Sequence, residues 1–74
     1  MLNLKDLRKA NKLSQADVAR GVEVDQTAVS YWERGKTGVC KKHRKRLCYV
    51  YDCSEEELLA AIEETRREAN NLVE

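Results

Sequence analysis

Polar side chains recur along residues 26–34 at the spacing of one helix face. They belong to Gln26, Thr27, Ser30, Tyr31 and Arg34, at positions i, i+1, i+4, i+5 and i+8. A glutamine amide can pair bidentately with adenine, and a hydroxyl beside apolar atoms suits a thymine methyl group. Each good base contact contributes about 1–3 kcal/mol of discrimination. This face therefore predicts contacts with DNA base edges, and the competing interpretation is a solvated helix face.

The helix that carries this face must be held by its other side. Val29 and Trp32 lie opposite the polar face, so we expect them to be buried. Asp25 is a plausible N-cap, and Gly35 supplies the left-handed residue that commonly ends a helix. The predicted helix therefore spans 26–34.

A second short helix precedes it by about one turn. The hydroxyl of Ser14 and the carboxylate of Asp17, three residues apart, approximate a capping box. A buried stripe is predicted at Val18, Ala19 and Val22. Two amphipathic helices in this order, over about 15–34, suit insertion of the second one into the major groove.

Three further helices complete the predicted architecture. They cover about 2–11, with Asn3 as a possible cap, about 41–51, and a last helix opened by the capping box Ser54–Glu57. The chain has no Pro and no alternating strand pattern, so its 74 residues predict one all-α, compact five-helix bundle. Further core candidates are Leu4, Leu7, Leu13, Leu47, Cys48, Val50, Tyr51, Leu58, Leu59 and Ile62.

Charge is distributed unevenly along the chain. Residues 1–53 carry 12 Lys and Arg against 6 Asp and Glu, whereas residues 54–74 carry 2 against 7. A basic front and an acidic tail indicate a polyanion-binding face with a segment kept away from it, the alternative being an ordinary solvated surface. In the basic run 41–46 we expect Lys41 and Lys42 to contact phosphates, ahead of simple solvation.

Other chemistry is poorly supported by the residue spacing. Cys40, His43, Cys48 and Cys53 do not have the spacing of a tight zinc site, and the last two occupy positions that favour buried small groups. The glutamates after Ser54 are better explained as a helix start than as catalytic acids. We expect no metal, no cofactor, no small-molecule ligand and no enzymatic activity. Without a signal-like or membrane-spanning apolar run, the expected compartment is the reducing cytoplasm.

The motifs resemble the Cro/repressor-type helix-turn-helix domains of bacteria and their phages, whose fold is of the lambda-repressor-like type. The matching segments, in register over about residues 4–62, are Leu7-Arg8, Leu13-Ser14-Gln15 with Ala19, Trp32-Glu33-Arg34-Gly35-Lys36, and Cys53-Ser54 before Leu58-Leu59. The resemblance implies that Gln15 contacts phosphate and supports the helix 26–34. It also implies base or nearby phosphate contacts on that helix, backbone contacts by Arg34 and Lys36, and an ion pair between Arg8 and Glu33.

Two positions depart from the family pattern. Glu23 stands where the turn between the paired helices usually has glycine, and Gly21 comes two residues earlier. Either Glu23 accepts a left-handed conformation at a cost of about 1–2 kcal/mol, or the helix ends early at Gly21 and the turn is reshaped. The segment 37–46 holds about one residue more than the pattern requires.

The last helix extends further than one domain requires. Leu58, Ile62, Thr65, Ala69 and Leu72 recur at heptad spacing. We define these five residues as the heptad seam, and the hypothesis is that they pack against a second copy. The alternative is a solvated tail. The predicted division is a DNA-binding domain over 1–62 and a helix extension, a possible dimerisation segment, over 63–74.

The expected function is that of a sequence-specific transcriptional regulator, a Cro-like repressor that binds a palindromic operator on double-stranded DNA as a homodimer. The resemblance implies a bacterial or phage-encoded, nucleoid-associated protein. A rival hypothesis is a protein-interaction module of the same fold, as in an antitoxin or anti-repressor, with the acidic tail as a ligand helix.

Overall fold

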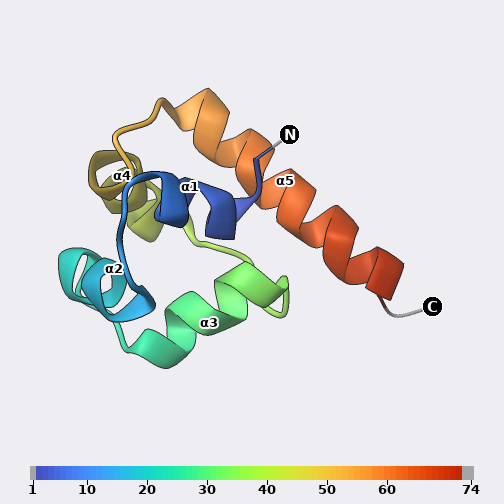
Figure 1. Cartoon of the computed structure of the whole chain (residues 1–74), viewed down its shortest axis with the longest axis horizontal. Helices are drawn as coiled ribbons and strands as arrows, with labels where there is room; N and C mark the ends of the chain where they lie inside the picture. Colours follow the sequence, from blue (N-terminus) through green and yellow to red (C-terminus); the bar gives the residue numbers. More distant parts are fainter. Residues whose placement is uncertain (1, 73–74) are drawn as a thin grey trace.

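Five α-helices make up the computed structural model, which describes residues 2–72, with the backbone alone at Leu72. The helices are α1 (Leu4–Ala10), α2 (Gln15–Val22), α3 (Gln26–Arg34), α4 (Lys41–Val50) and α5 (Glu55–Leu72). No strand occurs among these residues, so the predicted all-α bundle is confirmed. Figure 1 shows α2 and α3 joined by a short turn, with α5 passing across α1 and the end of α3.

Side-chain caps begin three of the helices as predicted. The Asn3 side chain accepts from Asp6 N at 2.8 Å, and Asp6 accepts from Asn3 N at 3.1 Å. The same reciprocal pair joins Ser14 to Asp17, at 3.1 and 2.9 Å. A third opens α5 from Ser54 with Glu57, both bonds being 3.1 Å. Each pair satisfies two N–H groups that the helix itself leaves without acceptors.

The predicted N-cap residue of α3 is confirmed in position but not as a side-chain cap. Asp25 occupies the N-cap position with extended backbone angles, but its side chain makes no capping hydrogen bond. Its carbonyl oxygen instead accepts from Ala28 N at 3.0 Å, and the side chain is exposed. The start of α3 is therefore held by packing against α2 and by this backbone bond.

A single apolar core lies between the five helices. Val18, Val29, Leu47 and Leu58 have no exposed surface, and Trp32 is 6% exposed. The prediction that Leu59 belongs to the core is wrong, because this residue is 37% exposed. The inward face of α5 runs through Leu58, Ala61 and Thr65, which leaves Leu59 on the side of the helix toward solvent.

The turn between α2 and α3 is resolved in favour of left-handed Glu23. Its φ is 64°, and α2 continues through Gly21 to Val22. Gly21 serves packing instead, because a Cβ there would lie 2.9 Å from a methyl group of Val50. The Glu23 carboxylate forms an ion pair with Arg46, with Oε2 and Nη1 3.2 Å apart, and both side chains are exposed.

The hypothesis that the heptad seam packs against a second copy is partly wrong. Leu58 is fully buried and Thr65 is 3% exposed, both within this chain. Ile62 and Ala69 are half-buried, and the side chain of Leu72 lies outside the described residues. The reason is that α5 packs against α1 and α3 with this same face, so the face is occupied before any second copy arrives.

No described helix is long and apolar enough to cross a bilayer.

Candidate nucleic-acid interface

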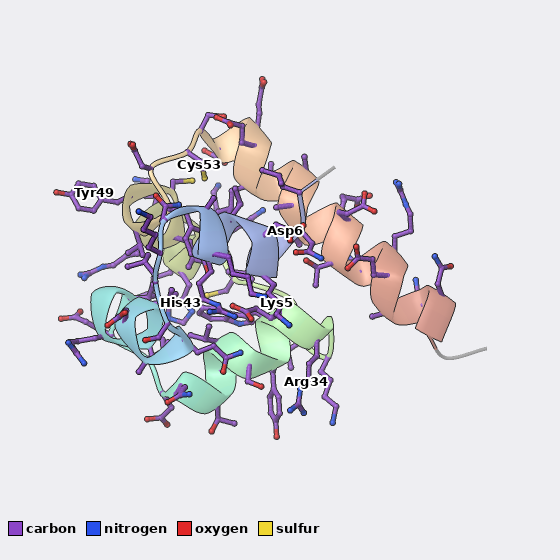
Figure 2. All side chains as sticks on the ribbon, viewed as in Figure 1. Lys5, Asp6, Arg34, His43, Tyr49 and Cys53 are labelled. Carbon is purple, nitrogen blue, oxygen red and sulfur yellow. The ribbon has the colours of Figure 1, made fainter. Side chains whose placement is uncertain are left out.

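The outward face of α3 is open to solvent. Gln26, Thr27, Tyr31 and Arg34 are exposed, and Ser30 is half-buried. Arg34 projects from α3 away from the other helices (Figure 2). Within residues 2–72, α5 does not cover this side, because it contacts α3 at the C-terminal end of that helix, around Gly35. The face is therefore accessible along its length.

An open polar hollow of about 410 Å³ lies between the start of α2 and this face. Six of the nine predicted site residues line it together: Gln15, Gln26, Thr27, Ser30, Tyr31 and Arg34. The lining offers amide, hydroxyl and guanidinium groups, which can donate and accept hydrogen bonds in several directions. Such a set suits the mixed donor and acceptor pattern of base edges and phosphates.

Lys36 lies beside this face and contacts it through Tyr31. Its ammonium is 5.5 Å from the centre of the Tyr31 ring, within cation–π range. Lys36 N also donates to Tyr31 O at 3.0 Å, and Gly35 N donates to Trp32 O at 3.2 Å. These two bonds are the Schellman pattern that ends a helix at a left-handed glycine. The Gly35 cap, with φ of 73°, is as predicted.

Glu33 organises the inner side of the interface. Arg8 donates to its carboxylate from Nε at 2.6 Å and from Nη2 at 3.2 Å, with both side chains largely buried. The hydrogen bond to Glu33 raises the pKa of Arg8, a shift that desolvation opposes. Arg8 also donates to Leu13 O at 3.0 Å. The ion pair implied by the resemblance is thus present, and it ties α1 to the end of α3.

Gln15 takes part in the same cluster, in keeping with the support for α3 that the resemblance implies, but the sequence did not identify Glu33 as its partner. Its amide nitrogen donates to Glu33 Oε1 at 3.1 Å, and the side chain is half-buried. Because Gln15 also lines the polar hollow, Glu33 positions a residue of α2 at the edge of the α3 face. The only available signal was the shared family motif, which links the two positions without naming their bond.

Lys41 and Lys42 are not brought into the hollow beside α3. Both are exposed in the first turn of α4. Lys41 lines a separate hollow of about 290 Å³ with Arg44, Lys45, Cys48 and Glu55. Their place in an interface depends on how far a duplex extends beyond α3.

His43, Cys48 and Cys53 make packing contacts, whereas Cys40 is exposed. The His43 ring lies 5.5 Å from the Trp32 ring at an angle of 45°, and its Nδ1 is 3.3 Å from Cys40 Sγ. Cys48 and Cys53 pack against the core, and burial raises the pKa of the Cys53 thiol to about 11. Within residues 2–72, no three His, Cys, Asp or Glu side chains are grouped so that they could hold a metal ion.

Comparison with known proteins places most of the chain in one family model. The model, described as helix-turn-helix, matches residues 4–58. These residues include α1 to α4, the capping box of α5 and the whole polar hollow. No curated protein and no solved structure gave a significant match.

Proposed function

The chain belongs to the Cro/repressor-type helix-turn-helix family and is a DNA-binding transcriptional regulator, and from this premise we propose that it is a Cro-like repressor acting at a palindromic operator. One observation carries the proposal. The polar residues of α2 and α3 line a single open hollow on a helix face that nothing in the described chain covers. A regulator needs such a face to meet base edges in the major groove.

We assign the contacts by chemistry and position. Gln26, Thr27 and Ser30, in the first turns of α3, are the base-reading candidates, and Tyr31 contributes a hydroxyl and an apolar ring. Phosphate contacts are proposed for Arg34 and Lys36 at the end of α3 and for Gln15 at the start of α2. Lys41 and Lys42 would contact phosphates at the flank of the duplex.

The length of α3 supports the proposal of two copies on one operator. Its nine residues span about 13 Å, which corresponds to about four base pairs. So short a half-site occurs too often in a genome to define a target. Two copies related by a two-fold axis would place their α3 helices about 34 Å apart on a palindrome, and an occupied operator would exclude polymerase. This argument does not depend on the heptad seam.

Selection of sites from a random duplex pool tests the proposal most directly. We expect an enriched palindrome whose half-sites lie about one helical turn apart. Titration of the enriched duplex at several salt concentrations should give a steep negative slope of log affinity against log salt. The reason is that Lys and Arg side chains displace counterions from the phosphates. An enriched site without symmetry would contradict the dimer. Absence of binding to any duplex at low salt would instead favour the protein-interaction module.

A base-reading role for Gln26 makes a separate prediction. Gln26→Ala should lose about 1–3 kcal/mol of preference for the enriched site over random duplex, with little change in affinity for random duplex. Equilibrium binding to both duplexes measures this. Asp25→Ala is the matched control, because Asp25 is next to Gln26 in the chain, is exposed and makes no side-chain cap bond. An equal loss on both duplexes would contradict base reading.

A further inference from the structure

The second half of α5 continues beyond the family match and is fixed to α1. The match ends at residue 58, whereas α5 runs to Leu72. The buried Thr65 hydroxyl accepts a hydrogen bond from Leu4 N at 3.0 Å and donates to Ala61 O at 2.9 Å. Both hydrogen-bonding capacities of this hydroxyl are used within the chain, which holds α5 at the first turn of α1.

A second contact strengthens this attachment one turn further on. The Asn3 side chain donates to Glu68 Oε1 at 2.6 Å, while Asn3 also caps α1. The position of α5 beyond the family match is therefore determined by bonds to two consecutive residues, Asn3 and Leu4. This half of the helix is part of the folded body up to Glu68 at least.

The adjoining side of the same segment contacts the end of α3. A Cβ added at Gly35 would lie 2.8 Å from the Ala69 Cβ, 3.3 Å from the Thr65 carbonyl oxygen and 3.6 Å from the Arg66 Cα. The backbone of α3 at its C-cap thus rests directly on the backbone of α5 and on one methyl group. Gly35 is required here for space as well as for its left-handed φ of 73°.

This contact has little capacity to adjust. The atoms nearest to Gly35 are a methyl group and backbone atoms of α5, and half-buried Ala69 lies closest, so we expect a larger group at position 69 to press on the end of α3. The buried Thr65 bond fixes α5 at α1, and Glu33 of α3 is itself held by Arg8. Strain from a larger residue 69 is therefore expected at the C-cap of α3, which follows Glu33.

We propose that Ala69 is a positioning residue for DNA recognition, which through Gly35 sets the placement of α3 on the duplex. The proposal rests on the function proposed above and names a part of the recognition apparatus outside the family match. Base contacts require donor–acceptor distances of about 2.7–3.2 Å and near-linear bonds, so a shift of α3 by an ångström breaks them. The long cationic side chains at 34 and 36 can follow a phosphate through such a shift.

The test compares Ala69→Leu with Ala60→Leu. Ala60 lies on the exposed side of the same helix, so its substitution adds the same groups without a contact to α3. We expect Ala69→Leu to lower the ratio of affinities for the enriched operator and random duplex by about ten-fold or more. The affinity of Ala69→Leu for random duplex should stay within two-fold of the native value. Its helix content should stay near that of the native chain. Ala60→Leu and the size-conserving Ala69→Ser should keep the full ratio.

Amide hydrogen exchange supplies the readout that separates positioning from stability. The Gly35 and Lys36 amides donate to Trp32 O and Tyr31 O. In Ala69→Leu these two amides should exchange faster while the amides of α2 and α4 keep their protection. If Ala69→Leu does not fold, Ala69→Val carries the same comparison.

The outcomes distinguish this proposal from the function on which it rests. If the native chain binds no duplex, the proposed function fails. If the native chain prefers its operator and the enlarged residue 69 leaves that preference intact, only the positioning role of Ala69 is overturned. A loss of equal size on operator and random duplex would also overturn it, since that result indicates a general loss of folded protein.

Discussion

Glu33 is the residue whose hydrogen bonds join three helices at the candidate interface. It receives Arg8 from α1 and Gln15 from α2 and itself belongs to α3. Its side chain is 5% exposed, so the charge is compensated by hydrogen bonds inside the protein and hardly by water. Removing one partner leaves the other as a buried charge, which costs more than the pair contributes.

Loss of this carboxylate should destabilise the protein strongly. Glu33→Ala is expected to lower the free energy of unfolding by about 3–5 kcal/mol, because the Arg8 guanidinium is then buried without a counter-charge. Urea unfolding measures the change. The control is Glu64→Ala, whose ion pair with Arg67 is longer, at 3.6 Å, and exposed on the arginine side. That substitution should cost less than about 1 kcal/mol, and equal losses would contradict the role of Glu33.

Tyr51 predicts a loss of stability in alkaline solution. Burial, and next the charge of Glu33, raise the pKa of this phenol above its ordinary value. The unfolded chain releases the proton near pH 10, whereas the folded protein retains it. The stabilising contribution is therefore complete below about pH 10, and it is lost at about 1.4 kcal/mol per pH unit as the pH rises further.

Urea unfolding between pH 9 and 12 tests this effect. Tyr51→Phe should flatten the profile above pH 10, while Tyr49→Phe, at a ring that is 90% exposed, should leave it unchanged. Cys53, whose pKa burial raises to about 11, contributes in the same direction in all three proteins. An unchanged slope in Tyr51→Phe would mean that the phenol is not responsible.

At the scale of the helices, local sequence rules predicted the starts better than the turns. Asn3, Ser14 and Ser54 cap as expected, because a capping box needs only residues three apart. Asp25 has the extended backbone angles of an N-cap, as Ser14 does, but its side chain makes no cap bond, and Ala28, three residues later, cannot complete a capping box. Left-handed Lys12 and Asp52 were not expected either, because nothing in their residue type requires that conformation.

The two kinds of helix start should differ measurably. Ser14→Ala is expected to lower the free energy of unfolding by about 1 kcal/mol, because the bond from Asp17 N to the Ser14 hydroxyl is lost. Asp25→Ala should cost about half a kcal/mol or less, from its charge near the helix dipole alone. Thermal and urea unfolding of the pair provide the comparison. A larger loss for Asp25→Ala would show that this carboxylate caps α3 in solution.

At the scale of the whole molecule, the fold class and the polar face were predictable, whereas the packing of α5 was not. Helix periods and family motifs define five helices and place five polar residues on one side of α3. The heptad spacing in α5 was correct as an apolar face but did not reveal what covers it. Periodicity identifies a buried side and says nothing of its partners, which here are α1, α3 and α4.

The uneven charge of the chain predicts how the flank of α4 contributes to binding. Each phosphate-neutralising cation adds about 0.9 to the slope of log affinity against log salt. Lys41→Ala and Lys42→Ala together should therefore reduce the slope by about 1.8. The control is Arg67→Ala, an exposed cation on α5 outside the proposed interface. An undiminished slope in the double variant would exclude these two lysines from the phosphate contacts.

The close approach at Gly35 has a consequence for anyone who wishes to retarget this scaffold. Gln26 and Thr27 are exposed and can be exchanged to seek another binding sequence. A graft that extends to Gly35 would instead press against Thr65 and Ala69 and tilt the whole insert. Libraries for new specificities should therefore vary the beginning of α3 and keep the last-turn glycine and its small neighbour as an inseparable pair.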